Sequence, residues 1–211
     1  MLDNYQLQSS TQLIAASQFL SQIDDDWAQL VGMVGECNFE QRQDNEPYEA
    51  LIRAVAYQQL HGKAGDAIFK RFLTIYNDSF PTPIQLLTTN FDHLRACGFS
   101  ARKIETIQGI ATTTISGIVP SRMEAIVITD EALIKRLTTL KGIGRWSVEI
   151  LLMFTLNRLD VLPAGDFGVV QGYKRLKNLE LAPSAKQMME IAKAYSPYRT
   201  VASWYLWRVP K

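Results

Sequence analysis

Two neighbouring segments carry the residues whose types and spacing could do chemistry. In the first, Gly142 and Gly144 flank the apolar Ile143 within the run from Leu140 to Leu156. Glycines let the backbone turn sharply, and the free amides that open the next helix suit a phosphate oxygen. Ile143 could pin such a turn into the core. Taken alone, the pattern is more typical of a tight turn between two structural helices, because Gly-x-Gly occurs often by chance.

The second segment, Leu162 to Val169, contains a carboxylate. It follows a predicted helix from Arg145 to Asn157 and puts Asp166 where the N-cap of the next helix would lie. An Asp there is often no more than a cap that accepts hydrogen bonds from backbone amides. The preceding helix would be about 20 Å long, and the return loop could carry Asp166 back toward the glycine turn. A carboxylate and a phosphate-binding turn could then share one cleft.

The elements that must position these segments are helices. Apolar residues recur at helical spacing almost throughout, and no convincing pair of alternating strands is joined by a tight turn. We therefore predict an all-α fold, with Thr129 and Ser184 as helix N-caps. The predicted helices cover 10–22, 24–34, 47–60, 62–76, 83–88, 90–96, 101–117, 129–139, 145–157, 166–177, 184–194 and 198–208.

Composition limits the class of protein. The 211 residues, 47% hydrophobic and 20% charged, suit one large domain or two small lobes. Only Cys37 and Cys97 are present, without a CxxC motif or a His cluster, so we expect no disulfide framework and no zinc or iron–sulfur site. The N-terminus lacks a signal-peptide pattern and no apolar run is long enough for a membrane span. These features predict a reduced, cytosolic protein.

Charge indicates local rather than extensive contact with nucleic acid. Twenty-two Lys and Arg against 21 Asp and Glu give a net charge of +1, unlike a protein that coats DNA. Acidic residues crowd the first quarter of the chain, whereas the last fifteen residues carry Arg199, Arg208 and Lys211 and no acid. We expect any DNA-binding face to lie away from the N-terminal acids.

Together these residues resemble a known superfamily. The hairpin Leu140 to Ser147 followed by Pro163 to Asp166 resembles the helix-hairpin-helix DNA glycosylases, whose signature is such a hairpin and a Gly/Pro-rich loop that ends in an essential Asp. The nearest likeness is the DNA-3-methyladenine glycosylase II type, with its small fungal and bacterial relatives. Further matching segments are 48–60, 97–103 and 197–207, so the resemblance spans about 47–210.

The resemblance implies one two-lobed glycosylase domain over residues 1–211. A helix-hairpin-helix lobe would cover about 47–165, and the second lobe about 1–46 with 166–211. The implied activity is excision of alkylated purines, of the 3-methyladenine and 7-methylguanine type, by base flipping and hydrolysis of the N-glycosidic bond in base excision repair. Asp166 would stay ionised near the sugar. A fixed carboxylate there stabilises the positive charge that develops on the sugar ring, and a cationic purine leaves without a strong acid.

Trp146 distinguishes this chemistry from that of the bifunctional relatives. Those enzymes carry a Schiff-base lysine two residues beyond the hairpin's second glycine, where this chain has Trp146. A lyase step by that route therefore has no nucleophile. The resemblance instead makes Trp146 and Trp207 walls of the base pocket, with Tyr48 and Tyr57 as weaker candidates. Each aromatic residue could equally be a core anchor, which is the reading that we favour for Trp204.

DNA contacts are also implied by the resemblance. The hairpin residues Gly142, Ile143, Gly144 and Arg145 would bind phosphate. The turn after Tyr57 would fill the space left by the flipped base, with its plug among Gln59, Leu60 and His61. Basic side chains become further phosphate contacts if they share a face with the hairpin; these are Lys63, Arg102, Lys103, Lys141 and Arg145.

The chain departs from its larger bacterial relatives at the N-terminus. They carry a β-rich domain there, whereas the acidic segment before Pro47 reads as helical, so we expect it to pack against the C-terminal helices. We expect no cofactor in the chemistry, although the family implies that Na⁺ or K⁺ can bind the hairpin carbonyls when DNA is bound. The partner would be double-stranded DNA containing alkylated bases. We expect a monomer in the bacterial nucleoid or, in a eukaryote, the nucleus.

Two alternatives stay open at this point. In a non-catalytic helix-hairpin-helix DNA-binding protein, Asp166 would be only a cap, and in a structural bundle the chain would not bind DNA at all. The sequence also leaves open which alkylated base is preferred, because that depends on the shape of the pocket.

Overall fold

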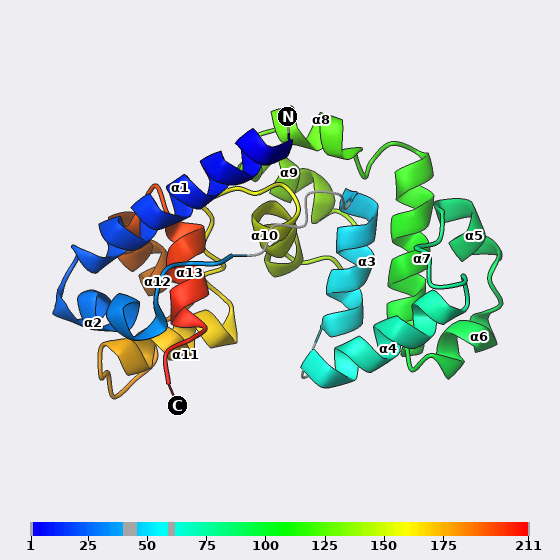
Figure 1. Cartoon of the computed structure of the whole chain (residues 1–211). Helices are drawn as coiled ribbons and strands as arrows, with labels where there is room; N and C mark the ends of the chain where they lie inside the picture. Colours follow the sequence, from blue (N-terminus) through cyan, green and yellow to red (C-terminus); the bar gives the residue numbers. More distant parts are fainter. Residues whose placement is uncertain (1, 40–45, 59–61, 211) are drawn as a thin grey trace. The chain divides into compact units, whose positions relative to one another are not determined.

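Helical periodicity correctly predicts the fold class of the described residues. The computed structural model describes residues 2–39, 46–58 and 62–210, and over these ranges it contains helices and no strand (Figure 1). The all-α prediction is therefore confirmed for the described residues.

The chain divides into two compact units. Residues 157–211 join residues 1–41 in one of them, here called the terminal unit, and residues 42–156 form the other, the hairpin unit. Sequence analysis placed residues 157–165 with the hairpin, but they belong to the terminal unit. The reason is local, because backbone and side-chain hydrogen bonds hold this segment to residues near the C-terminus.

The hairpin unit is built around helices α3 and α7. Helix α7 packs against α3 and α5, and α10 packs against α3. Phe72 lies in the core with its ring edge against Phe80 and Phe99, at centroid distances of 5.9 and 5.6 Å. The helices of this unit are α3 (Pro47–Tyr57), α4 (Gly62–Thr74), α5 (Pro83–Thr88), α6 (Phe91–Ala96), α7 (Ala101–Ile115), α8 (Arg122–Val127), α9 (Asp130–Leu137) and α10 (Arg145–Phe154).

The terminal unit joins the two ends of the chain. Its helices are α1 (Leu2–Ser21), α2 (Asp25–Val34), α11 (Phe167–Leu176), α12 (Ala185–Ile191) and α13 (Arg199–Leu206), with a 3₁₀ turn η1 (Ala192–Tyr195). Helix α13 packs against α11 and α1. The buried hydroxyl of Tyr205 donates to Ser17 Oγ or the Gly35 carbonyl, each at 2.8 Å. The N-terminal segment thus packs against the C-terminal helices, as expected.

Short polar side chains fix several helix starts. Thr129 and Ser184 accept hydrogen bonds from the amides of Ala132 and Gln187, which confirms both predicted N-caps. Helix α8 was missed, although Ser121 and Glu124 form a capping box at its start. Only one residue of α8 is buried, so apolar periodicity gives little signal there.

A helix that spans a membrane must be both long and apolar. None of the described helices is long and apolar enough to cross a bilayer.

Replacing Tyr205 with Phe tests how the two ends of the chain are joined. The variant removes the tyrosine hydroxyl from the buried Ser17 Oγ and from the Gly35 carbonyl, so we expect the free energy of unfolding to fall by about 1–2 kcal/mol. Urea denaturation measures the change. Tyr198→Phe is the control, because it keeps the ring contact with Phe19. Equal stability of the two variants would contradict this role for the hydroxyl.

Candidate functional site

Asp166 begins helix α11 and is held by two donors. Its Oδ1 accepts the backbone amide of Val169 at 2.8 Å, as an N-cap does, and the indole N–H of Trp207, also at 2.8 Å. The N-cap prediction is therefore confirmed, and the structure adds a second bond across the unit. Both donors bond the same oxygen, which lies at the positive end of the helix dipole. The half-buried carboxylate thus has a fixed orientation.

The hydrogen bond from Trp207 to Asp166 requires a glycine at position 168. A Cβ atom on Gly168 would lie 2.7 Å from Trp207 Cδ1 and 3.1 Å from Asp166 Oδ1. Real Cβ atoms essentially never approach other atoms as closely as 2.7 Å. Any larger residue at Gly168 would therefore displace the indole, the carboxylate or both.

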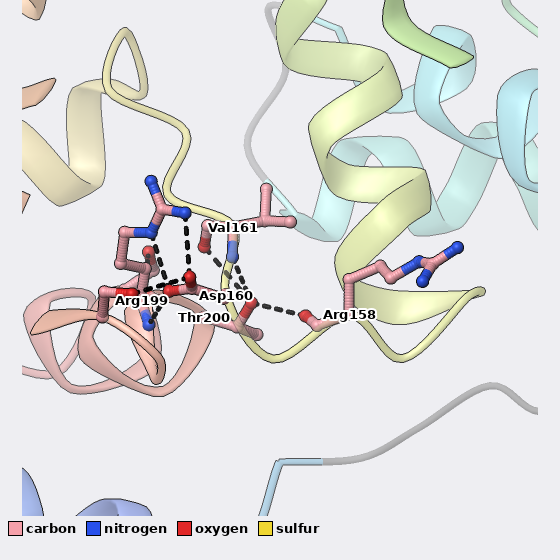
Figure 2. A network of polar contacts seen from close by, with 7 residues as sticks. Arg158, Asp160, Val161, Arg199 and Thr200 are labelled. Carbon is pink, nitrogen blue, oxygen red and sulfur yellow. Dashed lines mark hydrogen bonds and ion pairs between the residues drawn. The ribbon is translucent and has the colours of Figure 1, made fainter. Parts of the chain in front are cut away.

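The loop that leads to Asp166 is fastened at its start (Figure 2). Thr200, fully buried, donates through Oγ1 to the Arg158 carbonyl at 2.6 Å and accepts from the Val161 amide at 3.1 Å. The Thr200 amide donates to the Leu159 carbonyl at 2.9 Å. Three successive parts of the loop are therefore bonded to a single residue of α13.

An ion pair lies beside this contact. Arg199 donates through Nε and Nη2 to the two oxygens of Asp160 at 2.7 and 2.9 Å. Burial raises the pKa of Asp160, but hydrogen bonds from Arg199 and Ser196 outweigh it, so the pKa lies below its ordinary value. The carboxylate is ionised at neutral pH, and its stabilising contribution is lost as the pH falls through this lowered pKa.

The glycine turn of the hairpin unit has the expected local geometry. Gly142 has φ +85°, and a Cβ there would lie 2.4 Å from Thr106 Oγ1. Ile143 is buried, and Gly144 is the N-cap of α10 without a side-chain cap. The first amides of α10 therefore have no capping side chain from Gly144, which suits them to an external acceptor.

The turn is also tied to the end of α3. Gln58 donates through Nε2 to the Gly142 carbonyl at 3.2 Å and to Ser147 Oγ at 3.3 Å. Lys103 donates through Nζ to the carbonyls of Ala56 and Gln58 at 3.0 and 2.9 Å, and burial lowers its pKa. The Lys103 ammonium thus binds carbonyls at the end of α3 and at its C-cap.

Two other basic candidates have acidic partners within the hairpin unit. Arg145 pairs with Glu131 at 2.5 Å and with the buried Glu149 at 2.9 Å. Lys141 pairs with Glu105 at 3.0 Å. These pairs reduce the local positive charge on either side of the turn. Lys63 is exposed in the first turn of α4.

A cavity of about 160 Å³ lies within the hairpin unit, between α3 and α10. Trp146 and Tyr57, both predicted pocket residues, line it, and the Tyr57 hydroxyl donates to Asp66 at 2.5 Å. The remaining lining residues were not predicted from the sequence; they are Ala50, Arg53, Ala54, Ile150, Leu151, Phe154 and Thr155. Their helical spacing from the two aromatic residues was the signal that could have identified them.

The other aromatic candidates lie elsewhere. Tyr48 does not line this cavity, since its buried ring packs edge-on against Phe80 at 5.5 Å. Nine residues separate it from Tyr57, about two and a half helical turns, so the two side chains leave opposite sides of α3. Trp207 belongs to the terminal unit, where it bonds Asp166. Trp204 is buried, as expected for a core anchor.

Three candidates cannot be placed. Gln59, Leu60 and His61, the predicted plug, lie outside the described residues. Among the residues that are described, no group of three or more His, Cys, Asp or Glu side chains could hold a metal ion.

Comparison with known proteins identifies the family. Residues 52–197 match the model of the HhH-GPD superfamily base excision DNA repair proteins. The chain belongs to this family. The match includes the glycine turn, Trp146 and Asp166, so all three lie within the part of the chain that is common to the family.

Individual relatives cover nearly the whole chain. DNA-3-methyladenine glycosylase 1 of Schizosaccharomyces pombe is 48% identical over 203 residues, 95% of this chain and 89% of that protein. The alkylbase DNA glycosidase-like protein mag2 of the same organism is 37% identical and covers 93% of each chain.

Solved structures of the family have the same fold. The S. pombe 3-methyladenine DNA glycosylase in complex with abasic DNA superposes with a TM-score of 0.89 at 48% identity, over 92% of this chain and 95% of that one. The DNA-3-methyladenine glycosidase of Bacillus halodurans gives a TM-score of 0.76 at 32% identity, over 92% and 88%.

The turn geometry predicts unequal effects of two alanine substitutions. Gly142→Ala combines a positive φ with a clash against Thr106, so we expect a loss of about 2–3 kcal/mol in the free energy of unfolding. Gly144→Ala is the control, because its added Cβ meets nothing within 4 Å. Urea denaturation of both variants measures the difference. A stable Gly142→Ala protein would show that the turn can relax, contrary to this account.

Proposed function

We propose that the chain is a monofunctional DNA glycosylase that flips alkylated purines out of double-stranded DNA and hydrolyses their N-glycosidic bonds. The observation that carries the proposal is the Asp166 carboxylate, fixed at the start of α11 by Val169 and Trp207. The 48% identity to a DNA-3-methyladenine glycosylase over 95% of the chain supports the substrate class.

Asp166 acts on the sugar of the flipped nucleotide. Breaking the N-glycosidic bond places positive charge on the ring, and a carboxylate already held in one orientation stabilises this charge without reorganising. The same carboxylate positions the attacking water or accepts its proton. An alkylated purine that carries positive charge needs little help to leave, so one carboxylate is sufficient for the chemistry.

The cavity lined by Trp146 and Tyr57 receives the base. Electron-rich rings attract a cationic purine by stacking and cation–π interactions, of order 1–3 kcal/mol. Trp146 also occupies the position at which bifunctional members carry their lysine, so no covalent intermediate forms there and the strand stays intact. Trp207 contributes to the same reaction through Asp166, whether or not it also touches the base.

DNA is held mainly by backbone groups. The amides at Gly142 and Gly144 bind a phosphate, while Ile143, whose amide already donates to the Leu140 carbonyl, anchors the turn. Lys63 is a further phosphate contact, and Arg145 becomes one when it leaves Glu131 and Glu149. The plug that replaces the flipped base comes from Gln59, Leu60 or His61. The chemistry would use no cofactor, and the hairpin carbonyls would hold a Na⁺ or K⁺ ion when DNA is bound.

The partner in this proposal is duplex DNA containing alkylated bases, to which the protein binds as a monomer. An enzyme with this substrate works where the DNA is, in the nucleoid of a bacterium or the nucleus of a eukaryote. In this proposal the hairpin unit binds the phosphate and the base, and the terminal unit contributes the carboxylate.

One observation favours the alternative of a non-catalytic DNA-binding protein. Asp166 is an N-cap, and a purely structural cap would have the same bond to Val169. The additional bond from Trp207 and the excluded Cβ at Gly168 argue against a simple cap, because capping requires neither.

The Asp166→Asn variant distinguishes a catalytic carboxylate from a purely structural helix cap. Asparagine keeps a side-chain oxygen that can cap α11 but loses the negative charge, so we expect release of 3-methyladenine from methylated duplex DNA to fall by at least about 100-fold. Chromatography of the released bases measures this, with duplex affinity as the folding and binding control.

The abasic product completes the test. It should remain uncut without alkali, and borohydride should trap no covalent complex with the DNA. Equal release by the wild type and Asp166→Asn would remove Asp166 from the chemistry. Absence of release by the wild type, despite duplex binding, would contradict alkylpurine excision itself.

A further inference from the structure

The loop before Asp166 is bonded to α13 at both of its ends. At its start, Thr200 bonds the backbone of Arg158, Leu159 and Val161, as Figure 2 shows for the side-chain contacts. At its end, Trp207 donates to Asp166. The loop residues between these points, Val161 to Ala164, are buried.

The two contact points lie on one side of α13. Thr200 is in its first turn, and Trp207 is its C-cap, with φ −66° and ψ −16° that continue the helical conformation. Seven residues separate them, which is about two turns, so their side chains leave the same face. A rigid helix of fixed length therefore spans the distance between the start of the loop and the carboxylate.

We propose that α13 is the positioning helix of the active site, with Thr200 and Trp207 fixing the two ends of the loop and hence the orientation of Asp166. The inference rests on the proposed function, since it takes Asp166 as the reacting carboxylate. Thr200 is fully buried and acts only through the loop, so it is a positioning residue rather than a catalytic one.

The start of the loop is held in place by the hydroxyl of Thr200. Valine has nearly the same shape but would leave the buried Val161 amide and the partly buried Arg158 carbonyl without this partner. The start of the loop would move to recover hydrogen bonds, and Asp166 would move with it. Serine keeps the hydroxyl and should keep the loop in place.

Trp207 depends on Gly168 in the same way at the other end. The Cβ of an alanine there would meet the indole at 2.7 Å and the Asp166 carboxylate at 3.1 Å. Gly168→Ala thus disturbs the Trp207–Asp166 bond while both bonding residues remain present. It is an independent second variant if Thr200→Val proves too unstable to assay.

The experiment compares Thr200→Val with Thr200→Ser on a duplex that contains one 7-methylguanine. With enzyme in saturating excess, we expect the single-turnover rate of base release to fall about 10- to 100-fold in Thr200→Val, as a small misplacement of a reacting group can cause. Thr200→Ser should stay within about threefold of the wild type. Affinity for a duplex with a tetrahydrofuran abasic-site analogue should be unchanged in both.

Gly168→Ala is measured in the same way, with Gly32→Ala as its control. Gly32 lies in α2 of the terminal unit, and an added Cβ there meets nothing within 4 Å. We expect Gly168→Ala to lose rate as Thr200→Val does and Gly32→Ala to match the wild type. Circular dichroism melting confirms that each protein is folded at the assay temperature.

The outcomes distinguish the positioning role of α13 from the proposed function. Wild-type rates in folded Thr200→Val or Gly168→Ala would overturn the positioning role while leaving the proposed function intact. Equal losses in Thr200→Val and Thr200→Ser would also overturn it, since the hydroxyl would then not matter. If the wild type itself releases no base, the proposed function fails instead.

Discussion

The hydrogen bond from the Trp207 indole to the Asp166 carboxylate, together with the bond from the Val169 amide, determines how this side chain is oriented. A carboxylate on a mobile side chain would have to be oriented anew for each reaction, whereas one held by two donors is oriented in advance. This bond requires that α11 begin at Asp166, that residue 168 carry no side chain beside the indole, and that α13 lie at a fixed distance from the loop before Asp166. Thr200 meets the last of these requirements, because it bonds the start of the loop to the first turn of α13.

The hairpin unit holds a sharp backbone turn in a fixed position. Gly142 makes the turn, Ile143 anchors it, and Gln58 and Lys103 tie it to the end of α3. The cavity lined by Trp146 and Tyr57 lies between α3 and α10. The two units have separate cores, and the glycine turn lies in one of them and Asp166 in the other.

Sequence alone predicted much of this because local chemistry determines it. Helical periodicity defined most helices, and the caps at Thr129, Asp166 and Ser184 follow from side chains that bond an amide three residues ahead. The bond between Trp207 and Asp166 joins residues 41 positions apart, and the pairing of Arg145 with Glu131 is also non-local. Such contacts depend on packing, so neither could be read from spacing. The placement of Tyr48 away from the pocket was predictable from the helical period.

A crystal structure of Asp166→Asn bound to a duplex containing 7-methylguanine would test the central claim most directly. The account predicts the modified base turned out of the duplex, with its sugar C1′ within about 4 Å of the substituted side chain at position 166, close to reacting distance. The base still paired in the duplex, or a flipped base with its sugar far from position 166, would contradict the assignment of Asp166 as the catalytic carboxylate.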